Sequence, residues 1–456
     1  MTRFLLLQLV FLALGTGALP VLGIARDRVQ MRARLPLAYL VGVSLAGIVA
    51  AHLALLNAAF GVTELVVLTG LVWLVAWRRL RGTPGDKVSL GRRGRDVVGV
   101  IAFALALVLL AHVTHMLETR PLYEWDGWAI WATKARALYD FGGAYGPVFT
   151  TYPPVQHPLF LPALEAIDFH ALGRFDGTLV HVQLGMLGFG FAAALWTLLR
   201  ERVPAALAGL GVLAIVSATA FVKQLSTNYA DVPLALFVAL GAVCLARWLS
   251  EGDKTLLPAA ALFLGTATLT KPEGLLFALA AFAAALVAGE RTRLRGTLFT
   301  GAAVALILLP WRIFTSVHHL RNPEYSFGDA VNPAYLYDHA ERLGPALRSV
   351  AGHAFSFDWG LLAPLGLVAI VVALSSGLTR RLGVFAGLWT LLSFAGIVLV
   401  FWISVVPVEL TLRWAAYRTV AALVVGLAAL APLLAGEAWN VAAANRSVNA
   451  GGSRTR

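Results

Sequence analysis

Residues 97–116 read VVGVIAFALALVLLAHVTHM, a block without a single Asp, Glu, Lys or Arg. As a helix, a stretch of this length matches the hydrocarbon thickness of a bilayer. The sequence therefore predicts an all-α polytopic membrane protein with about thirteen transmembrane helices. The other twelve apolar blocks lie near 4–24, 35–57, 60–77, 178–199, 204–222, 231–249, 256–270, 274–289, 297–315, 359–376, 382–404 and 416–436.

The composition of the 456 residues supports this class. Hydrophobic residues make up 59% of the chain and charged residues 13%, whereas soluble domains carry about 45–50% and about 25%. These values exclude a water-soluble globular enzyme and also intrinsic disorder, which needs low hydrophobicity. An outer-membrane barrel is disfavoured because the apolar residues form blocks instead of alternating. Cys244 is the only cysteine, so no intramolecular disulfide or thiol redox pair can form.

Four basic clusters predict the orientation. With thirteen spans they all fall on one side, which the positive-inside rule makes cytoplasmic. The N-terminus is then expected outside and the C-terminus in the cytoplasm. Because these loops account for the net charge of +12, no nucleic-acid partner is predicted. The clusters are Arg26, Arg28, Arg32 and Arg34; Arg78, Arg79, Arg81, Lys87, Arg92, Arg93 and Arg95; Arg291, Arg293 and Arg295; and Arg380 with Arg381.

The composition also indicates the compartment. Many Ala, Leu and Gly residues, with far more Arg than Lys, are typical of a GC-rich bacterium, so we expect the bacterial cytoplasmic (inner) membrane. An alternative interpretation makes the first block a signal peptide, whose removal would leave the remaining topology unchanged.

The long polar segments are expected outside, and they set the domain boundaries. The predicted divisions are 1–96, three spans with a basic cytoplasmic loop; 97–315, a catalytic module with the first outer loop at 117–177; 316–358, the second outer loop; and 359–456, the last spans and a short tail. Both outer loops are expected to contain short interfacial helices. The cytoplasmic loops are short and contain no nucleotide-binding fingerprint, so any chemistry is expected outside.

The first outer loop carries two acids beside tryptophans. Glu124 and Asp126 precede a predicted helix in which Trp128, Trp131, Ala135 and Leu138 share one face. An aromatic, basic helix next to a span is expected to lie in the membrane interface. Asp126 is then a candidate general base with Glu124 as second choice, and the structural alternative is a helix N-cap.

Other polar residues recur at the same boundary. Tyr152 and His157 lie in a proline-rich stretch, which is either a rigid substrate-facing segment or a plain connector. Asp231, two residues before Pro233, is either an N-cap or a second acid in the same cavity.

Charged residues between or near the spans are the remaining candidates. Lys271 and Glu273 separate two spans and are expected either to line a polar cavity or to pair with each other. Arg312, Arg413 and Arg418 are either snorkelling anchors or ligands of a lipid phosphate.

These short motifs, in this order and on one predicted face, resemble the GT-C superfamily of integral-membrane glycosyltransferases. The similarity is greatest to the protein O-mannosyltransferase and lipid A aminoarabinose transferase-like group, and it covers roughly 95–415. The catalytic loop of that group usually follows its first span, whereas here it follows the fourth. The motifs are Glu124-Trp125-Asp126-Gly127-Trp128, Tyr152-Pro153-Pro154 with His157-Pro158, Tyr229-Ala230-Asp231-Val232-Pro233, Thr270-Lys271-Pro272-Glu273-Gly274 and Pro310-Trp311-Arg312.

The resemblance implies an inverting transfer of a sugar at the extracytoplasmic face, as part of cell-envelope assembly. The donor would be a polyprenyl-phosphate sugar held among membrane lipids, and the acceptor a lipid, a glycan or a protein. Asp126 would be the general base, with Glu124 and Asp231 as further catalytic acids. The implied substrate-binding residues are His157, Tyr152, Lys271, Glu273, Arg312 and Arg413. Some members use a divalent cation, for which these acids are suitable ligands, but the sequence assigns no metal site and no certain cofactor.

Two other functions are compatible with the same pattern. A transporter or flippase of a lipid-linked sugar would also need many spans and buried charges, but we find no inverted repeat of the transporter type. A lipid-linked glycan ligase would be expected to carry its major outer loop late in the chain, whereas here the acid-bearing loop comes early.

Overall fold

The computed structural model describes residues 1–81, 96–152 and 154–452, and within them the chain is helical. The only β-type contact in this part is an isolated antiparallel bridge between Tyr325 and Ser404. The basic residues Lys87, Arg92, Arg93 and Arg95 of the second predicted cluster lie outside the described residues.

Each predicted apolar block is helical in the structure, although the block at 204–222 is divided between two helices. The longer helices are α1 (Thr2–Val21), α3 (Ala38–Leu55), α4 (Val62–Leu80), α5 (Val97–Leu117), α9 (Leu179–Arg200), α10 (Ala205–Ser217), α12 (Asp231–Glu251), α13 (Leu256–Thr270), α14 (Glu273–Ala288), α15 (Arg291–Val317), α19 (Leu362–Ser375), α20 (Arg380–Trp402) and α23 (Ala421–Gly452). The shorter ones are α2 (Arg28–Ala33), η1 (Leu35–Leu37), η2 (Gly127–Ala132), α6 (Thr133–Phe141), α7 (Pro147–Thr150), α8 (Phe160–Leu172), α11 (Thr219–Leu225), α16 (Phe327–Ala330), α17 (Pro333–Asp338), η3 (Ala340–Arg342), α18 (Leu343–Ala354), η4 (Phe357–Trp359), α21 (Val408–Thr411), η5 (Leu412–Ala416) and α22 (Tyr417–Thr419).

The predicted count of thirteen membrane spans is not confirmed. By length and apolarity, 8 helices of the described chain can cross a membrane, or up to 10 if each of two bent pairs is one span. The bent pairs are α10 with α11, at 60°, and Ala340–Trp359 with α19, at 106°. At 1.5 Å per residue, α13 and α14 are each about 23 Å long, which is shorter than a hydrocarbon core of about 30 Å.

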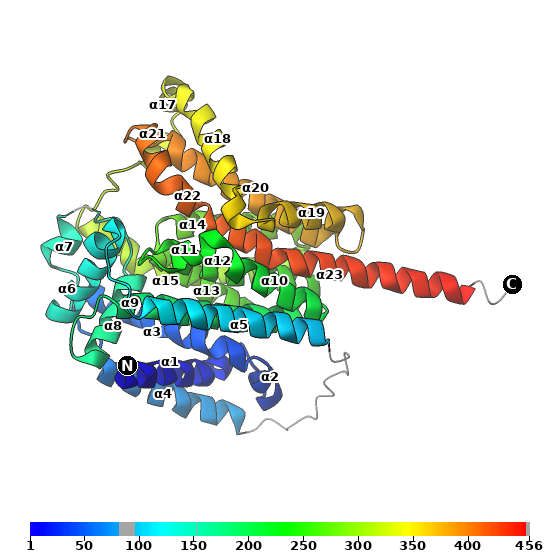
Figure 1. Ribbon diagram of the computed structural model, residues 1–456, viewed down its shortest axis with the longest axis horizontal. Coiled ribbons are helices and arrows are strands. Elements are labelled where there is room, and N and C mark those ends of the chain that lie inside the picture. The colour runs from blue at the N-terminus through cyan, green and yellow to red at the C-terminus, as the bar shows by residue number, and fades with distance from the viewer. Residues whose placement is uncertain (82–95, 153, 453–456) are drawn as a thin grey trace.

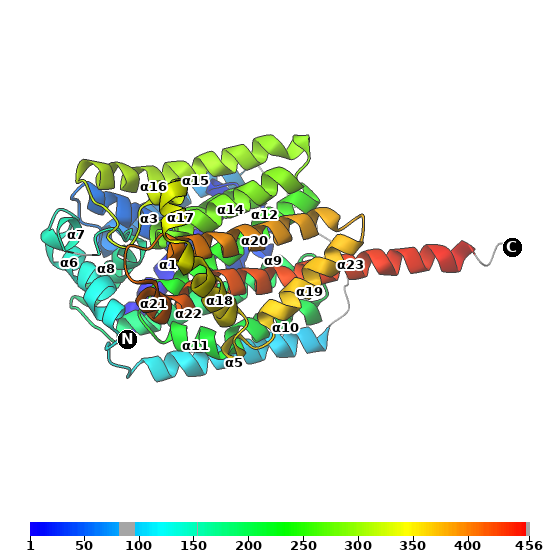
Figure 2. The same ribbon diagram turned by 90° about the horizontal axis from the view of Figure 1, so that it is seen from above.

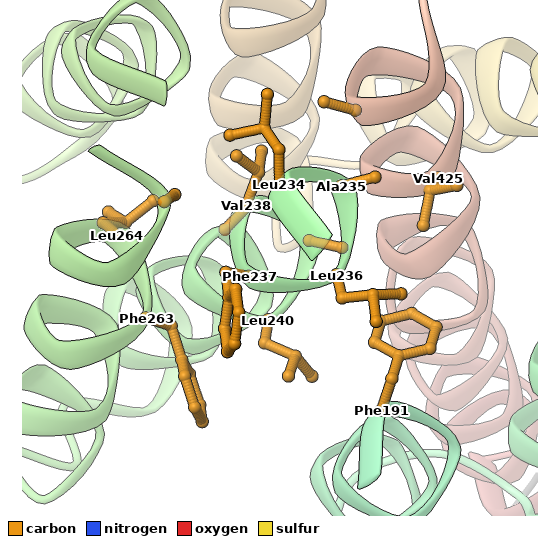
Figure 3. Packing of buried hydrophobic residues seen from close by; sticks show 14 of the residues in the cluster. Phe191, Leu234, Ala235, Leu236, Phe237, Val238, Leu240, Phe263, Leu264 and Val425 are labelled. Atoms are coloured by element: carbon orange, nitrogen blue, oxygen red, sulfur yellow. The ribbon is translucent and has the colours of Figure 1, made fainter. Parts of the chain in front are cut away.

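Helix α12 forms the centre of the bundle, and its residues 231–249 are all buried. Figure 3 shows its side chains meeting those of α13, α9 and α23. Phe237 of α12 packs edge-on against Phe160 with ring centroids 5.4 Å apart. At Gly241, a Cβ atom would lie 2.6 Å from Cγ of Leu264, so glycine allows α13 to pack closely there. This packing fixes Asp231, the first residue of α12.

The peripheral helices expose large apolar side chains. Along α15, Leu306, Ile313 and Val317 each expose more than half of their surface. Contiguous apolar surfaces of this kind are rare on soluble proteins and are expected to contact lipid here. Together with the 8–10 spans, they make this chain an integral membrane protein.

The long helices run between two ends of the molecule (Figures 1 and 2). We call the end that carries α6, α7 and α8 the site end, and the end from which α23 projects the tail end. The N-terminus lies near the site end and the C-terminus beyond the tail end. Helix α12 therefore starts at the site end and finishes at the tail end, where Arg247 binds Glu201 and Glu251 in a buried ion-pair network.

The first outer loop differs from its prediction. Trp131, Ala135 and Leu138 are buried within the protein, and only Trp128 is exposed, at 44%. The predicted interfacial stripe is therefore wrong for three of its four members. The cause is α8, a buried helix within 117–177, whose Phe169 packs in one cluster with Ala135.

Candidate functional site

Asp126 and Arg418 form an ion pair at the site end. Nη1 of Arg418 donates a hydrogen bond to the Asp126 carboxylate. The alternative of an N-cap fails on geometry, because the Asp126 side chain makes no capping bond to η2. Its side chain keeps 22% of its surface exposed, so a substrate can reach a carboxylate whose orientation the guanidinium fixes.

Both partners adjoin a π-helical turn. Asp126 precedes η2, and Arg418 lies just after η5. A π turn rotates the side chains that follow it relative to an α-helix, and such turns are frequent at functional sites. The sequence alone places Arg418 in one group with Arg312 and Arg413, and the structure singles it out as the partner of Asp126. Arg413, the predicted ligand, is exposed and is not among the described residues that line the cavity below.

Lys271 connects two of the other predicted acids. Its Nζ donates a hydrogen bond to Oδ1 of Asp231 over 2.8 Å and lies 3.5 Å from Oε1 of Glu273. Asp231 makes no side-chain cap bond, so the structure gives it the ion-pairing role and not the N-cap role. The predicted pairing of Lys271 with Glu273 is also present, but this contact is longer than the one between Lys271 and Asp231.

Arg418 joins the two ion pairs. Its guanidinium lies 4.7 Å from the ring centroid of Tyr229, and it is close enough to Asp231 for their charges to interact. The structure therefore brings together Asp126, Asp231 and Lys271, which lie far apart in the sequence. We call these three residues, with Glu273, Arg418 and Glu324, the charge cluster.

Glu324 is a member of the cluster that the sequence analysis missed. Its backbone carbonyl accepts a hydrogen bond from Val405 N at 2.8 Å, next to the Tyr325–Ser404 bridge. Enclosure by the protein, followed by the charge of Glu273, raises the pKa of the Glu324 carboxyl, while Lys271 and Arg418 oppose this shift. Its sequence context is an unremarkable polar loop, so no pattern distinguishes it.

Glu124 points to a different set of partners. Its Oε1 accepts a hydrogen bond from Arg120 at 2.5 Å, and its Oε2 lies 3.9 Å from Nε2 of His181. The Glu124 side chain is only 8% exposed, so of the three predicted acids Asp126 is the most accessible.

A cavity of about 580 Å³ adjoins the charge cluster. Its walls contain neighbours in sequence of Lys271, His157 and Glu324, and its size is typical of small-molecule sites. Arg312 and Arg321 contribute positive charge, while Leu275, Leu308 and Trp311 contribute apolar surface. The described lining residues are Gln156, Pro158, Thr268, Pro272, Leu275, Leu308, Trp311, Arg312, Thr315, Ser316, Leu320, Arg321, Asn322, Tyr325 and Ser326.

A buried lysine fixes the proline-rich segment beside this cavity. Lys134 donates hydrogen bonds to the carbonyl oxygens of Pro154, at 2.8 Å, and His157, at 3.5 Å. Burial lowers the pKa of Lys134 to about 7. His157 packs against Trp131 with ring centroids 4.9 Å apart, and burial, then the charge of Lys134, lowers its pKa well below the usual value. Tyr152 is exposed at 62%.

Two buried acids on α8 lie outside the predicted site. Glu165 and Asp168 are 0% exposed, and their carboxyl oxygens have no hydrogen-bond partner that meets normal geometry within the described residues. Burial raises the pKa of Glu165 to about 8, and the nearby Asn228 partly opposes this; burial, and then the charge of Glu165, raise the pKa of Asp168 well above its usual value. Acids within an apolar segment are the signal that would have revealed them.

We expect Glu165→Gln to change the pH dependence of stability. The folded protein holds the Glu165 proton up to about pH 8, whereas an unfolded glutamate loses it near 4.5. The native state therefore binds more protons in this window, and stability falls as the pH rises through it. Glutamine mimics the protonated acid, so the variant should match the wild type at low pH and melt at a higher temperature at pH 8. Thermal melting in detergent across this range tests it, and equal melting temperatures at pH 8 would contradict it.

The described residues contain no group of three or more His, Cys, Asp and Glu side chains placed to hold a metal ion. Asp126 and Asp231 are instead paired with Arg418 and Lys271. Metal dependence stays a prediction of the resemblance alone.

The structure is that of a polytopic membrane protein with an acid-rich polar site at one end of its bundle. Residues 156–314 match the family model of dolichyl-phosphate-mannose-protein mannosyltransferase, so this segment is a GT-C family domain and the resemblance is confirmed. The matched segment includes His157, Asp231, Lys271 and Arg312, whereas Asp126 lies before it. No curated protein and no solved structure matches the chain.

Proposed function

We propose that this membrane glycosyltransferase moves a sugar from a polyprenyl-phosphate donor to a hydroxyl-bearing acceptor, with inversion at the anomeric carbon. The observation that carries the proposal is the convergence of Asp126, Asp231 and Lys271, through Arg418, beside a cavity with arginines in its wall. The family match supports the glycosyltransferase class.

Asp126 acts as the general base. Its carboxylate takes the proton of the acceptor hydroxyl while that oxygen forms a bond to the anomeric carbon and the bond from this carbon to the phosphate oxygen breaks. The acceptor oxygen attacks the face of the anomeric carbon opposite the phosphate, so the configuration inverts, and polyprenyl phosphate departs with the bonding electrons. Arg418 orients Asp126, and Asp231 orients Lys271 in the same way.

Negative charge develops on the phosphate as it departs. Nearby cations stabilise this charge most strongly once it has developed fully. Arg312 lies in the cavity wall, and Lys271 lies next to the wall residue Pro272. The isoprenoid tail extends from the cavity along α15, whose outward side chains are apolar. Tyr152, which is exposed, is assigned to the acceptor side, whereas Glu124 positions the loop through Arg120.

The site end faces the extracytoplasmic side of a bacterial inner membrane in this proposal. Its support is the distribution of basic clusters: Arg34 pairs with Asp253 at 2.7 Å and Arg381 with Glu290, both away from the site end. The positive-inside rule assigns the tail end, which carries these basic clusters, to the cytoplasm.

A reporter fused after Tyr145 should therefore be active only outside the cytoplasm. One inserted after Lys87 should be active only inside it. A phosphatase and a fluorescent protein at each position give the two independent measurements. The reverse pattern would place the site in the cytoplasm and exclude the proposed face.

The reaction is tested with purified protein in lipid nanodiscs and radiolabelled polyprenyl-phosphate mannose, supplied with candidate lipid, glycan and protein acceptors. Release of polyprenyl phosphate with label on an acceptor supports the transferase. Movement of the intact donor across a vesicle membrane without bond cleavage would support the flippase instead. Transfer of a preassembled glycan but no single sugar would identify a ligase.

A further inference from the structure

Gln156 places an unpaired amide in the wall of the cavity. The residue is only 9% exposed, and neither Nε2 nor Oε1 has a hydrogen-bond partner within the described residues. Buried polar atoms in native proteins are nearly always paired, and each exception needs an explanation. An amide with both atoms unpaired is what a site built for a missing polar ligand would show.

The backbone around Gln156 cannot easily turn the amide away. Lys134 holds the carbonyl oxygens of Pro154 and His157 on either side. Pro154 and Pro158 further restrict the backbone of the segment. The backbone that carries the amide is therefore held in place before a ligand arrives, which lowers the entropy lost on binding.

The hydrogen-bonding groups of the amide suit the sugar of a donor better than its phosphate. Its Nε2 donates and its Oε1 accepts, and sugar hydroxyls do both. A phosphate offers only acceptors at its oxygens, so Oε1 would repel it. Arg312 and Arg321, in the same cavity, have the donor groups and the charge that a phosphate prefers. The cavity thus contains separate groups for a phosphate and for a hydroxyl-bearing ring.

We propose that Gln156 determines sugar specificity by binding hydroxyl groups of the donor sugar, while the cavity arginines bind the phosphate. This inference rests on the proposed function. Lys134 is a positioning residue that holds Gln156 in place through the backbone. A site that hydrogen-bonds a substrate hydroxyl discriminates strongly against analogues that lack it, because its own polar groups are then left unpaired.

The test is Gln156→Met, which keeps the length of the side chain and removes both polar atoms. Binding is measured in nanodiscs for polyprenyl-phosphate mannose, glucose and arabinose, the monodeoxy analogues of the tightest binder, and sugar-free polyprenyl phosphate. The wild type should prefer the hydroxylated donor over one monodeoxy analogue, and the variant should lose about tenfold of that preference. Affinity for polyprenyl phosphate should be unchanged, and the melting temperature without donor should not fall, because no existing hydrogen bond is lost.

The matched control is Gln183→Met, whose amide donates to Tyr39 Oη at 3.2 Å and accepts from Gln8 at 2.9 Å. It should lower the melting temperature and leave sugar preference intact. Should Gln156→Met fail to fold, Gln156→Asn withdraws the amide and is judged by the same preference. Wild-type preference retained in a folded variant would overturn the role of Gln156. A wild type that binds neither sugar donors nor polyprenyl phosphate would overturn the proposed function itself.

Discussion

Asp126→Asn is expected to lower turnover about 10²–10⁴-fold, the usual contribution of a general base. Asparagine has nearly the same shape and still accepts a hydrogen bond from Arg418, so the pair that fixes this loop stays in place. What is lost is the ability to take the proton from the acceptor hydroxyl. The effect should appear in kcat, because Asp126 is not assigned to donor binding.

Two quantities are measured with purified protein: donor affinity at equilibrium, and turnover at saturating donor and acceptor. Asp140→Asn is the matched control, since Asp140 also lies in the first outer loop and makes only an exposed ion pair with Arg136. It should leave both quantities near the wild-type values. A near-normal rate for Asp126→Asn would remove Asp126 from the role of base, and Glu324 would be the next carboxylate to test.

Lys271→Met should be the most destabilising single change in the site. Asp231 is 3% exposed and receives its short hydrogen bond from Lys271, so the substitution leaves a buried carboxylate without that partner. Removing one member of a buried ion pair costs about 3–5 kcal/mol. The melting temperature in detergent should drop, and adding Asp231→Asn should recover much of the loss because the uncompensated charge is gone.

A solvent-exposed ion pair provides the comparison. Lys223 lies 3.2 Å from Asp358, with 64% and 52% of the two side chains exposed. Solvent screens such a pair, and its loss is expected to cost less than about 1 kcal/mol. Equal destabilisation by Lys223→Met and Lys271→Met would contradict the assignment of a buried, structure-critical pair. Failure of Asp231→Asn to rescue the double variant would do the same.

The helical bundle was predictable because apolar blocks of span length give a strong signal. Each block is helical, although 204–222 forms two helices, and the predicted break at Lys271 is present, where proline and glycine end one helix and start the next. The number of spans was not predictable from blocks alone, because α13 and α14 are apolar but too short. Helix α8 was missed because its apolar stretch is only 13 residues long, too short for a membrane span, and is interrupted by Glu165 and Asp168.

From the sequence, Asp126 and Asp231 could be predicted as site residues more readily than Arg418. Asp126, Asp231 and Lys271 lie together because the helices and loops that carry them meet at the site end. Arg418 could not be chosen over Arg413, because the π turn at η5 sets which arginine reaches the acids. Glu324 and Gln156 enter through loops held by Ser404 and Lys134, contacts that join distant parts of the chain and leave no local pattern.

The most direct test of the account is a cryo-electron microscopy structure of the protein in a nanodisc with a non-hydrolysable polyprenyl-phosphonate sugar. We expect the phosphonate against Arg312 and Lys271, the isoprenoid chain along α15, and the anomeric carbon on the side of Asp126. A lipid head group bound at the tail end, or midway along the bundle with its sugar away from Asp126, would contradict the account and favour a transport function.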